Sequence, residues 1–149
     1  MTEDLRAPAS LRRLVSWQAG RLATIGARLT AQRLPLEARS DFAVLASLEE
    51  RGPLSQAELG RVLALDRNNV NGIVTRLESR AQIERRTDPA DRRRNIVSIT
   101  PAGRERFGVL EGHAAGVQRE LLKALDHEEG EQLVALLDRV LAAHPREPA

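Results

Sequence analysis

The segment LSQAELGRVLALDRNNVNGIVTRLESR, residues 54–80, decides the fold because it carries the signals of two short helices joined by a tight turn. Ser55 and Glu58 stand three residues apart, as in a capping box. Leu54 and Leu59 occupy the two positions of a hydrophobic staple. The pattern predicts a short helix that begins just after the serine.

A second helix is expected after a turn of three or four residues. Asp66 can cap this helix, which should end near Arg80. At 100° per residue its aliphatic side chains fall within about 60° of Val70 and predict one buried stripe. The stripe consists of Val70, Ile73, Val74 and Leu77. Two helices joined by so short a turn predict a helix-turn-helix.

The opposite face of the second helix is small and polar. It holds Asn68, Gly72, Thr75 and Ser79, with Asn69 and Arg76 at one edge and Asn71 at the other. An asparagine carboxamide offers a donor and an acceptor together, which matches the N6 and N7 edge of adenine in a major groove. Gly72 costs about 1 kcal/mol relative to alanine, and close approach of the backbone to DNA would offset that cost. A solvated face with incidental asparagine and glycine is the alternative.

A basic hairpin is expected to follow the second helix. Residues 83–87 and 95–99 read as strands, and the turn between them holds three consecutive arginines, Arg92, Arg93 and Arg94. Asp88 and Asp91 can hold one of them while the others reach outward, and a narrow AT-rich minor groove attracts such side chains. A solvated charge run is the alternative. Arg85 and Arg86 point to opposite faces of the first strand, so one of the two is expected to contact phosphates.

Helical periodicity describes the rest of the chain. A first helix is expected over residues 10–31, a second over 40–50, a long helix from Pro101 through Leu125, and a final helix capped by Asp126. Pro35 separates the first two, and Thr100 with Pro101 begins the long one. The predicted class is mainly α with a small β-hairpin wing (α+β).

Composition narrows the classes of function. The 149 residues suit one domain, the chain has no cysteine, and no segment resembles a signal peptide or a membrane span, so a cytoplasmic protein without a membrane partner is expected. Of the 23 basic residues 22 are arginine, and residues 66–106 carry a charge of +4 whereas residues 107–149 carry −4. Three aromatic residues offer few stacking platforms for single strands. We find no catalytic constellation and no metal-site spacing of histidines, and we expect no cofactor.

Nearly the whole chain, taken in order, resembles the MarR family of winged helix-turn-helix transcription regulators, most specifically over residues 52–105. The core of the match is the wing, Asp88-Pro89 and Asp91-x-Arg93, followed by the motif Val97-x-Ile99-Thr100-Pro101-x-Gly103. The resemblance implies an obligate homodimer in which residues 1–34 and 101–149 interlock and residues 35–100 form the DNA-binding lobe, all within one intertwined domain. It also implies that each subunit sets one recognition helix into a pseudo-palindromic, double-stranded operator.

The resemblance and the patterns of the helix and hairpin together give the candidate DNA-binding residues. They are Ser55, Gln56, Arg67, Asn68, Asn69, Asn71, Gly72, Thr75, Arg76, Arg86, Asp91, Arg92, Arg93 and Arg94. Three features depart from the family pattern. Many relatives have arginine or serine in place of Gly72. Ala81 and Gln82 replace the usual glycine and apolar residue, so the bend into the wing is either less sharp or strained. The redox-sensing branch needs cysteine, which this chain lacks.

Family members often release DNA when a small aromatic or anionic effector binds between the dimerisation helices and the DNA-binding lobe. Gly108, Gly112 and Gly116 repeat every four residues, which either permits close helix packing or leaves a hollow. If a hollow exists, its candidate effector-binding residues are Trp17, Arg21, Phe42 and His113. Two hypotheses stay open: a repressor released by an effector, and a constitutive winged-helix binder without one. An enzyme is disfavoured.

Overall fold

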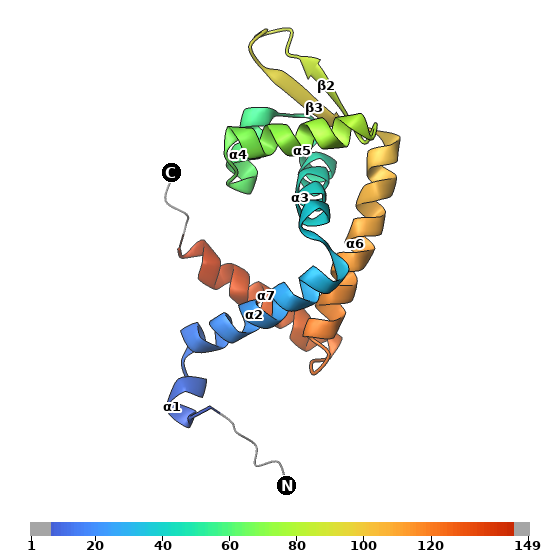
Figure 1. Ribbon diagram of the computed structural model, residues 1–149. Helices are drawn as coiled ribbons and strands as arrows, with labels where there is room; N and C mark the ends of the chain where they lie inside the picture. The colour runs from blue at the N-terminus through green and yellow to red at the C-terminus, as the bar shows by residue number, and fades with distance from the viewer. Residues whose placement is uncertain (1–6, 145–149) are drawn as a thin grey trace.

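The computed structural model describes residues 7–144 and confirms a mainly helical fold with a small sheet (Figure 1). The three strands are antiparallel in the order β1-β3-β2. The helices are α1 (Ala9–Arg12), α2 (Val15–Arg33), α3 (Leu36–Arg51), α4 (Gln56–Leu63), α5 (Arg67–Ser79), α6 (Pro101–Leu121) and α7 (His127–Ala142). The strands are β1 (Leu54–Ser55), β2 (Ile83–Thr87) and β3 (Asn95–Ile99).

The core lies in the lobe built from α3, α4, α5 and the sheet. All four residues of the predicted α5 stripe are buried, and they pack against Val44, Leu45 and Leu48 of α3, Leu59 of α4, and Ile83 and Val97 of the strands. Phe42 of α3 stacks on Phe107 of α6 at a centroid distance of 5.7 Å, which joins this lobe to the long helix.

The predicted helix caps are confirmed. Ser55 and Glu58 form a reciprocal capping box at α4, and Asp66 caps α5 by accepting the Asn69 N–H. Thr100 caps α6 with Pro101 in its first turn, and Asp126 caps α7. Both predicted strands have the expected bounds.

The prediction of one helix over residues 10–31 is wrong. The chain leaves the helical conformation at Leu14, which has ψ of 118°, and so divides the segment into α1 and α2. The Gln18 side chain donates to the Arg12 carbonyl at 2.9 Å, which satisfies a backbone group left open by the break. No glycine or proline marks this position, so the apolar periodicity ran through it unbroken.

Three smaller expectations also need correction. α3 begins at Leu36 rather than at residue 40, because Pro35 precedes it at the N-cap. α6 ends at Leu121, and Leu125 lies in the following turn, where its N–H donates to the Leu122 carbonyl at 2.8 Å. The two-residue strand β1 was not predicted, because its pairing with β3 depends on tertiary contact rather than on local pattern.

The bend before β2 is sharp, and its backbone is strained. Ala81 adopts φ of +56°, a left-handed conformation that side chains disfavour by roughly 1–2 kcal/mol. The Thr100 hydroxyl donates to the Ala81 carbonyl at 2.7 Å and stabilises the bend. The sequence left two outcomes open where Ala81 replaces the usual glycine, a less sharp bend or a strained one. The structure shows the strained one.

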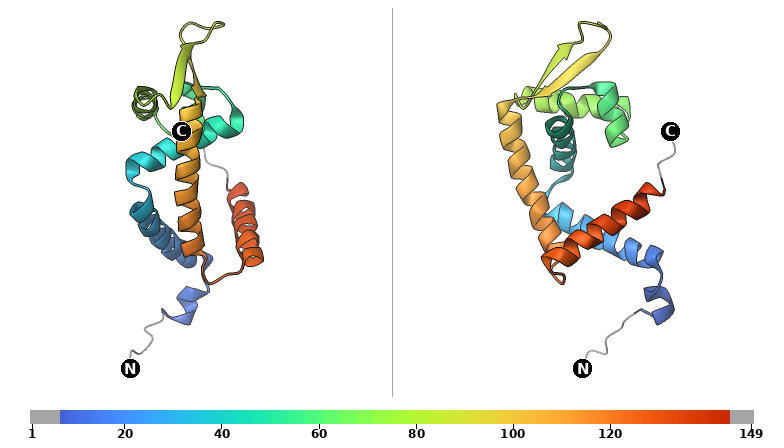
Figure 2. Two further views of the ribbon diagram at one scale, coloured as in Figure 1. Left: turned by 90° about the vertical axis from the view of Figure 1, so that its right-hand side faces the viewer. Right: turned by 180° about the vertical axis from the view of Figure 1, so that it is seen from behind.

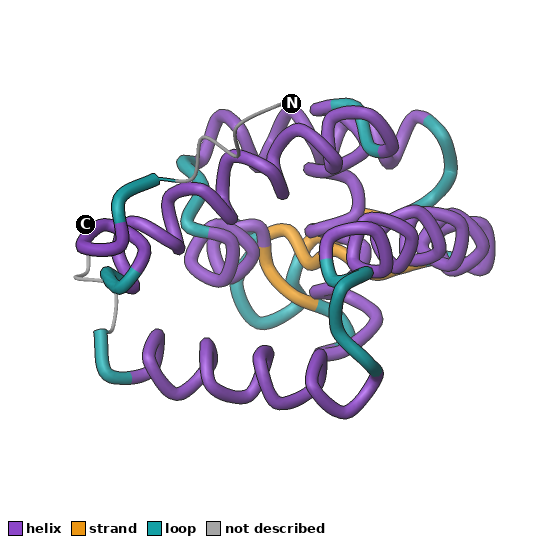
Figure 3. The backbone as a smooth tube through the Cα atoms, turned by 90° about the horizontal axis from the view of Figure 1, so that it is seen from below, coloured by secondary structure: helices purple, strands orange, loops and turns teal. Residues whose placement is uncertain are grey.

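α6 connects the lobe to the other end of the molecule (Figure 1). It starts at the base of the hairpin and packs on α3 and then on α2. The left view of Figure 2 places α2 and α7 on opposite sides of its lower half. α7 stands apart from the rest of the chain in the view from below (Figure 3). Gly130 is the single buried residue of this helix. Between residues 7 and 144 no helix is long and apolar enough to cross a bilayer.

Candidate DNA-binding site

The helix-turn-helix presents α5 on the outside of the lobe, beside the hairpin (Figure 1). Ala64, at φ of +53°, ends α4, and α5 begins three residues later. The exposed residues of α5 include the predicted candidates Arg67, Asn68, Asn69, Asn71, Gly72 and Thr75. Apart from the adjoining residues and backbone of its own helix, no atom of residues 7–144 lies within 4 Å of a Cβ built on Gly72. The polar face predicted from the helical wheel is therefore accessible along its length.

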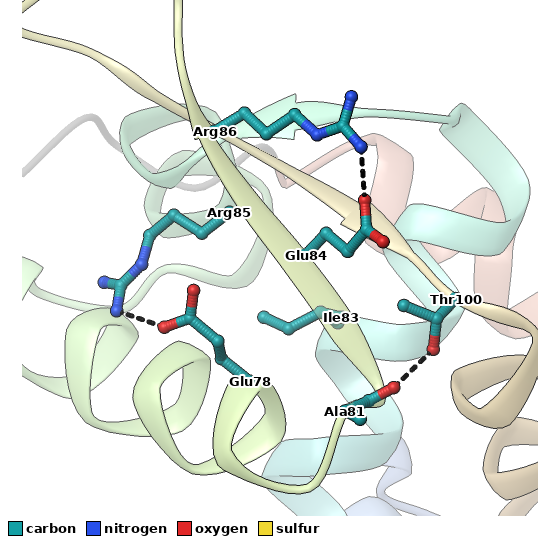
Figure 4. Close-up of a pocket in the computed structure, with 7 residues that line it drawn as sticks. All are labelled: Glu78, Ala81, Ile83, Glu84, Arg85, Arg86 and Thr100. Atoms are coloured by element: carbon teal, nitrogen blue, oxygen red, sulfur yellow. Dashed lines mark hydrogen bonds and ion pairs between the residues drawn. The ribbon is translucent and has the colours of Figure 1, made fainter.

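Asn71 lies at the centre of a hydrogen-bond network that joins α5 to the sheet. Its side-chain oxygen accepts from Arg85 at 3.2 Å and from the Gln56 amide at 3.4 Å. Arg85 in turn bonds Glu78 at 2.6 Å, a pair seen in close-up in Figure 4. The side-chain NH2 of Asn95 on β3 donates to the side-chain oxygen of Gln56 at 3.5 Å. The position of the wing strands is thus tied to the polar face of α5.

Two predicted contact residues serve the interior of the lobe. Ser55 is 1% exposed, and its hydroxyl accepts the Glu58 N–H, so it does not belong to the exposed surface. Arg76 turns away from the polar face toward α3, where it donates to buried Asp41 and, at 3.1 Å, to Ser40. The helical wheel gave the position of Arg76 correctly, but not the direction of its long side chain.

Arg76 and Arg80 form one ion-pair network with two carboxylates of α3. Asp41 is fully buried, and Arg80 approaches it at 3.5 Å. Arg80 also pairs with Glu37 at 2.6 Å, and this hydrogen bond holds the pKa of Glu37 below its ordinary value. The network fixes the angle between α5 and α3.

The hairpin tip is organised by its aspartates, but through the backbone. Asp88 accepts the Ala90 N–H at 2.9 Å and Asp91 accepts the Arg93 N–H at 3.0 Å. These bonds shape the turn, whereas the sequence suggested that the aspartates hold an arginine side chain. Arg92 and Arg93 are exposed and have no ion pair with another residue in the range 7–144.

Arg94 and Arg86 each have a carboxylate neighbour. Arg94 lies 3.7 Å from Glu58, the carboxylate of the α4 capping box. The pKa of Glu58 is lowered chiefly because its carboxylate accepts the Ser55 backbone N–H, with Arg94 contributing. Arg86 pairs with Glu84 at 2.9 Å along the same strand.

An open pocket of about 410 Å³ lies at the base of the hairpin (Figure 4). Its lining residues are Glu78, Ala81, Ile83, Glu84, Arg85, Arg86 and Thr100. None of the candidate effector-binding residues borders it. Within residues 7–144 no group of histidine and acidic side chains is arranged to hold a metal ion.

The candidate effector-binding residues fall into separate places. The Arg21 guanidinium lies over the Trp17 ring at 5.2 Å on α2, whereas Phe42 stacks on Phe107 between α3 and α6. His113 is exposed on α6. The structure brings Trp17 and Arg21 together, but it does not gather the four residues around one cavity of a single chain.

The glycine stripe of α6 is open at two of its three positions. A Cβ on Gly108 or Gly112 would meet nothing within 4 Å in the described chain. A Cβ on Gly116 would lie 2.7 Å from a guanidinium nitrogen of Arg33, so this glycine lets α2 approach α6 closely. Within one chain, close packing explains Gly116 and leaves Gly108 and Gly112 without a neighbour.

Sequence reasoning missed two residues that support this surface, Asp41 and Glu78, and it missed the hydrogen bonds that Arg85 makes within the protein. The partners lie on other elements: Arg76 is 35 residues from Asp41, and Arg85 is 7 residues from Glu78. The one available signal was the acidic residue within the apolar pattern of residues 40–50, since a buried carboxylate requires a partner.

Comparison with known proteins identifies the family. A model of the MarR family matches residues 38–94. The HTH-type transcriptional repressor NicR of Pseudomonas putida is 44% identical over 62 residues, which are 42% of this chain and 39% of that repressor. The chain therefore spans well under two thirds of the length of NicR.

Two solved structures extend the likeness to most of the chain. A probable transcriptional regulator from Pseudomonas aeruginosa is 34% identical, with a TM-score of 0.71 over 87% of this chain and 98% of that one. Bordetella bronchiseptica BpsR, whose DNA binding is regulated by 6-hydroxynicotinic acid, is 26% identical, with a TM-score of 0.70 over 85% of this chain and 97% of that one. These relatives are regulators of transcription and not enzymes. Because the family model matches the helix-turn-helix and the start of the wing, and these structures cover most of the chain, the chain belongs to the MarR family.

Proposed function

We propose that the protein is a homodimeric, cytoplasmic transcriptional repressor that binds a pseudo-palindromic, double-stranded operator in a sequence-specific manner and is released by a small aromatic or anionic effector. The observation that carries the proposal is the α5 face, polar and accessible over its length, beside a hairpin with exposed arginines. A helix presented in this way fits the major groove, and a hairpin beside it reaches the neighbouring minor groove.

The proposed contact set follows from exposure. Arg67, Asn68, Asn69, Asn71 and Thr75 contact base edges or phosphates from α5, with Gln56 at the start of α4. Arg92, Arg93, Arg94 and Arg86 contact the backbone or the minor groove from the wing, and Asp91 shapes the tip. Ser55 and Arg76 act indirectly, by capping α4 and by orienting α5.

Apolar surface on α2 and α7 supports the homodimer. Val134, Leu136, Leu137, Val140 and Leu141 of α7 are all exposed in the single chain, Leu141 by 66%. Leu14 and Val15, where α2 begins, are exposed by 50% and 74%. Contiguous apolar surface of this kind needs a cover, and a second copy related by a two-fold axis supplies one through the same residues. The segments 1–34 and 101–149 then form the dimer interface, although residues 1–6 and 145–149 lie outside the described structure.

The repressor role and the effector rest on relatives. NicR is a repressor, and BpsR responds to 6-hydroxynicotinic acid, an aromatic anion. The Trp17–Arg21 pair offers an aromatic face and a cation to such a ligand, and Gly108 and Gly112 leave room on α6. A constitutive binder remains the second candidate, since these groups do not line a shared cavity within one chain.

A footprint of the purified protein on its own promoter region tests the proposal, using 6-hydroxynicotinic acid and benzoate as probes. The repressor predicts a protected operator whose protection falls with one of these acids, together with a rise of the thermal unfolding midpoint. A protected operator with no response to either acid would favour the constitutive binder. Absence of any preferred DNA sequence would contradict both candidates.

Replacing Arg93 by alanine is expected to weaken operator binding and to reduce the slope of log affinity against log salt by about one, because one phosphate-neutralising charge is lost. Fluorescence anisotropy across a salt titration measures both quantities. The matched variant Arg104→Ala, on the exposed side of α6 and paired with Glu49, should leave the slope unchanged. An unaltered slope for Arg93→Ala would exclude a DNA contact by this arginine.

Replacing Gly72 by alanine is expected to separate stability from binding. The free protein should gain about 1 kcal/mol of unfolding free energy, because alanine is the better helix former and no atom obstructs its Cβ. Operator affinity should fall, because the added methyl group keeps the backbone of α5 from approaching the bases. Urea denaturation and anisotropy test the two effects, and equal or tighter DNA binding would show that Gly72 does not face DNA.

A further inference from the structure

The asparagines of α5 differ in the hydrogen bonds they make within the protein. We infer that Asn71 contacts DNA as a hydrogen-bond donor only, and therefore selects a keto base, guanine or thymine, at its position in each half-site. This inference rests on the proposed function, since it assigns base chemistry to one residue of the proposed reading face. It replaces, for Asn71, the bidentate adenine contact expected from the sequence.

The orientation of the Asn71 amide is set by Arg85. A guanidinium has donors and no acceptor, so the Asn71 atom that lies 3.2 Å from Arg85 Nη1 must be the oxygen. Gln56 Nε2 reaches the same oxygen at 3.4 Å. Flipping the Asn71 carboxamide would place its NH2 against the Arg85 guanidinium and would break the hydrogen bonds to both Arg85 and Gln56. The oxygen is thus engaged inside the protein, and the NH2 is the part left for a ligand.

Arg85 cannot easily leave this position. Its second terminal nitrogen donates to Glu78 at 2.6 Å, and its side chain is only 21% exposed. Gln56 also contacts Asn71. Its side-chain oxygen accepts hydrogen bonds from Asn95 and Arg85, each at 3.5 Å. Four elements, α4, α5, β2 and β3, therefore contribute to one frame around the Asn71 oxygen.

A free NH2 group distinguishes the bases by their major-groove edges. Guanine offers two acceptors, O6 and N7, and thymine offers O4. Cytosine presents only a donor, which repels another donor. Adenine offers N7, but its N6 amino group would lie beside the contact without an acceptor, and an unpaired buried donor is unfavourable. The frame around Asn71 therefore favours guanine and thymine over adenine and cytosine.

The neighbouring asparagines show that this restriction is specific to Asn71. Asn69 donates its own NH2 to Asp66 at 2.6 Å, so its oxygen remains available as an acceptor. Asn68 is exposed, and its carboxamide makes no hydrogen bond with another residue among 7–144, so it keeps both groups for a bidentate adenine contact. The three asparagine side chains are chemically identical, but each has a different set of hydrogen-bonding groups left free for DNA.

Selection of bound sequences from a randomised double-stranded library, using the full chain, tests the inference. Comparison with Asn71→Ala identifies the base position that Asn71 reads, as the position whose preference is lost. In the wild type that position should favour guanine or thymine over adenine by about tenfold. Arg85→Met frees the amide to turn over, so adenine should become as frequent as the keto bases. The control Arg104→Met removes an arginine–glutamate pair between α6 and α3 and should keep the wild-type preference.

A second variant keeps the test decisive if Arg85→Met does not fold, which thermal unfolding would show. Asn71→Asp keeps an oxygen acceptor for Arg85 and Gln56 but has no donor. The preference of about tenfold for guanine or thymine over adenine should therefore disappear. Adenine at the Asn71 position in the wild type, or a keto preference that survives Asn71→Asp, would overturn the inference. A wild type that enriches no sequence at all would contradict the proposed function instead, which separates the two failures.

Discussion

Replacing Gly103 by alanine is expected to lower the free energy of unfolding by about 3 kcal/mol, because a new side chain would collide with backbone. A Cβ on Gly103 would lie 2.0 Å from the Gln82 carbonyl oxygen and 2.8 Å from Ile99. The carbonyl cannot move aside, since the Thr100 N–H donates to it at 3.1 Å where α6 meets the bend before β2.

Urea denaturation of Gly103→Ala and Gly72→Ala at one protein concentration compares their free energies of unfolding. Both variants exchange a helical glycine for the better helix former, so propensity alone predicts the same gain for each. The contacts predict opposite signs, because Gly72 has no neighbour within 4 Å. A stable Gly103→Ala protein would mean that α6 does not dock on the bend as described.

Replacing Arg76 by methionine is also expected to cost about 3 kcal/mol, because it leaves the Asp41 carboxylate buried without its main partner. The Asp41 side chain is 1% exposed, and only Arg80, at 3.5 Å, remains beside it. Asp41→Leu should cost less, since the Arg76 that it leaves behind is 25% exposed and keeps Ser40 and Glu37 as partners.

The double variant Asp41→Leu, Arg76→Met should recover most of the lost stability, because an apolar pair of similar volume replaces a buried ion pair. Unfolding in urea at matched concentration gives the coupling free energy of the cycle. Additive single effects would show that the two side chains do not interact, and would remove the ion pair as the support of α5.

Local signals in the sequence predicted much of the fold. The caps at Ser55, Asp66, Thr100 and Asp126 each depend on a few neighbouring residues, and the structure confirms all four. The buried stripe of α5 followed from helical periodicity alone, because one face of a short helix next to a core must be apolar.

Features that depend on distant contacts could not be predicted. Arg76 on α5 turns to Asp41 on α3, whereas Arg85 on β2 turns to Asn71 and Glu78 on α5, and neither local sequence indicates the partner. The break between α1 and α2 carries no glycine or proline, and its apolar residues are not buried in the single chain. Their periodicity indicated helical conformation but did not show the break at Leu14 or what the two helices pack against.

Sedimentation velocity, with the free protein at micromolar concentration and with operator duplexes, tests the central claim most directly. The claim is that two subunits place their α5 helices on half-sites one helical turn apart, about 34 Å. It predicts a free dimer, and one dimer bound to a duplex that carries both half-sites, with much weaker binding when one half-site is scrambled. A monomer that binds each half-site independently and with equal affinity would contradict it.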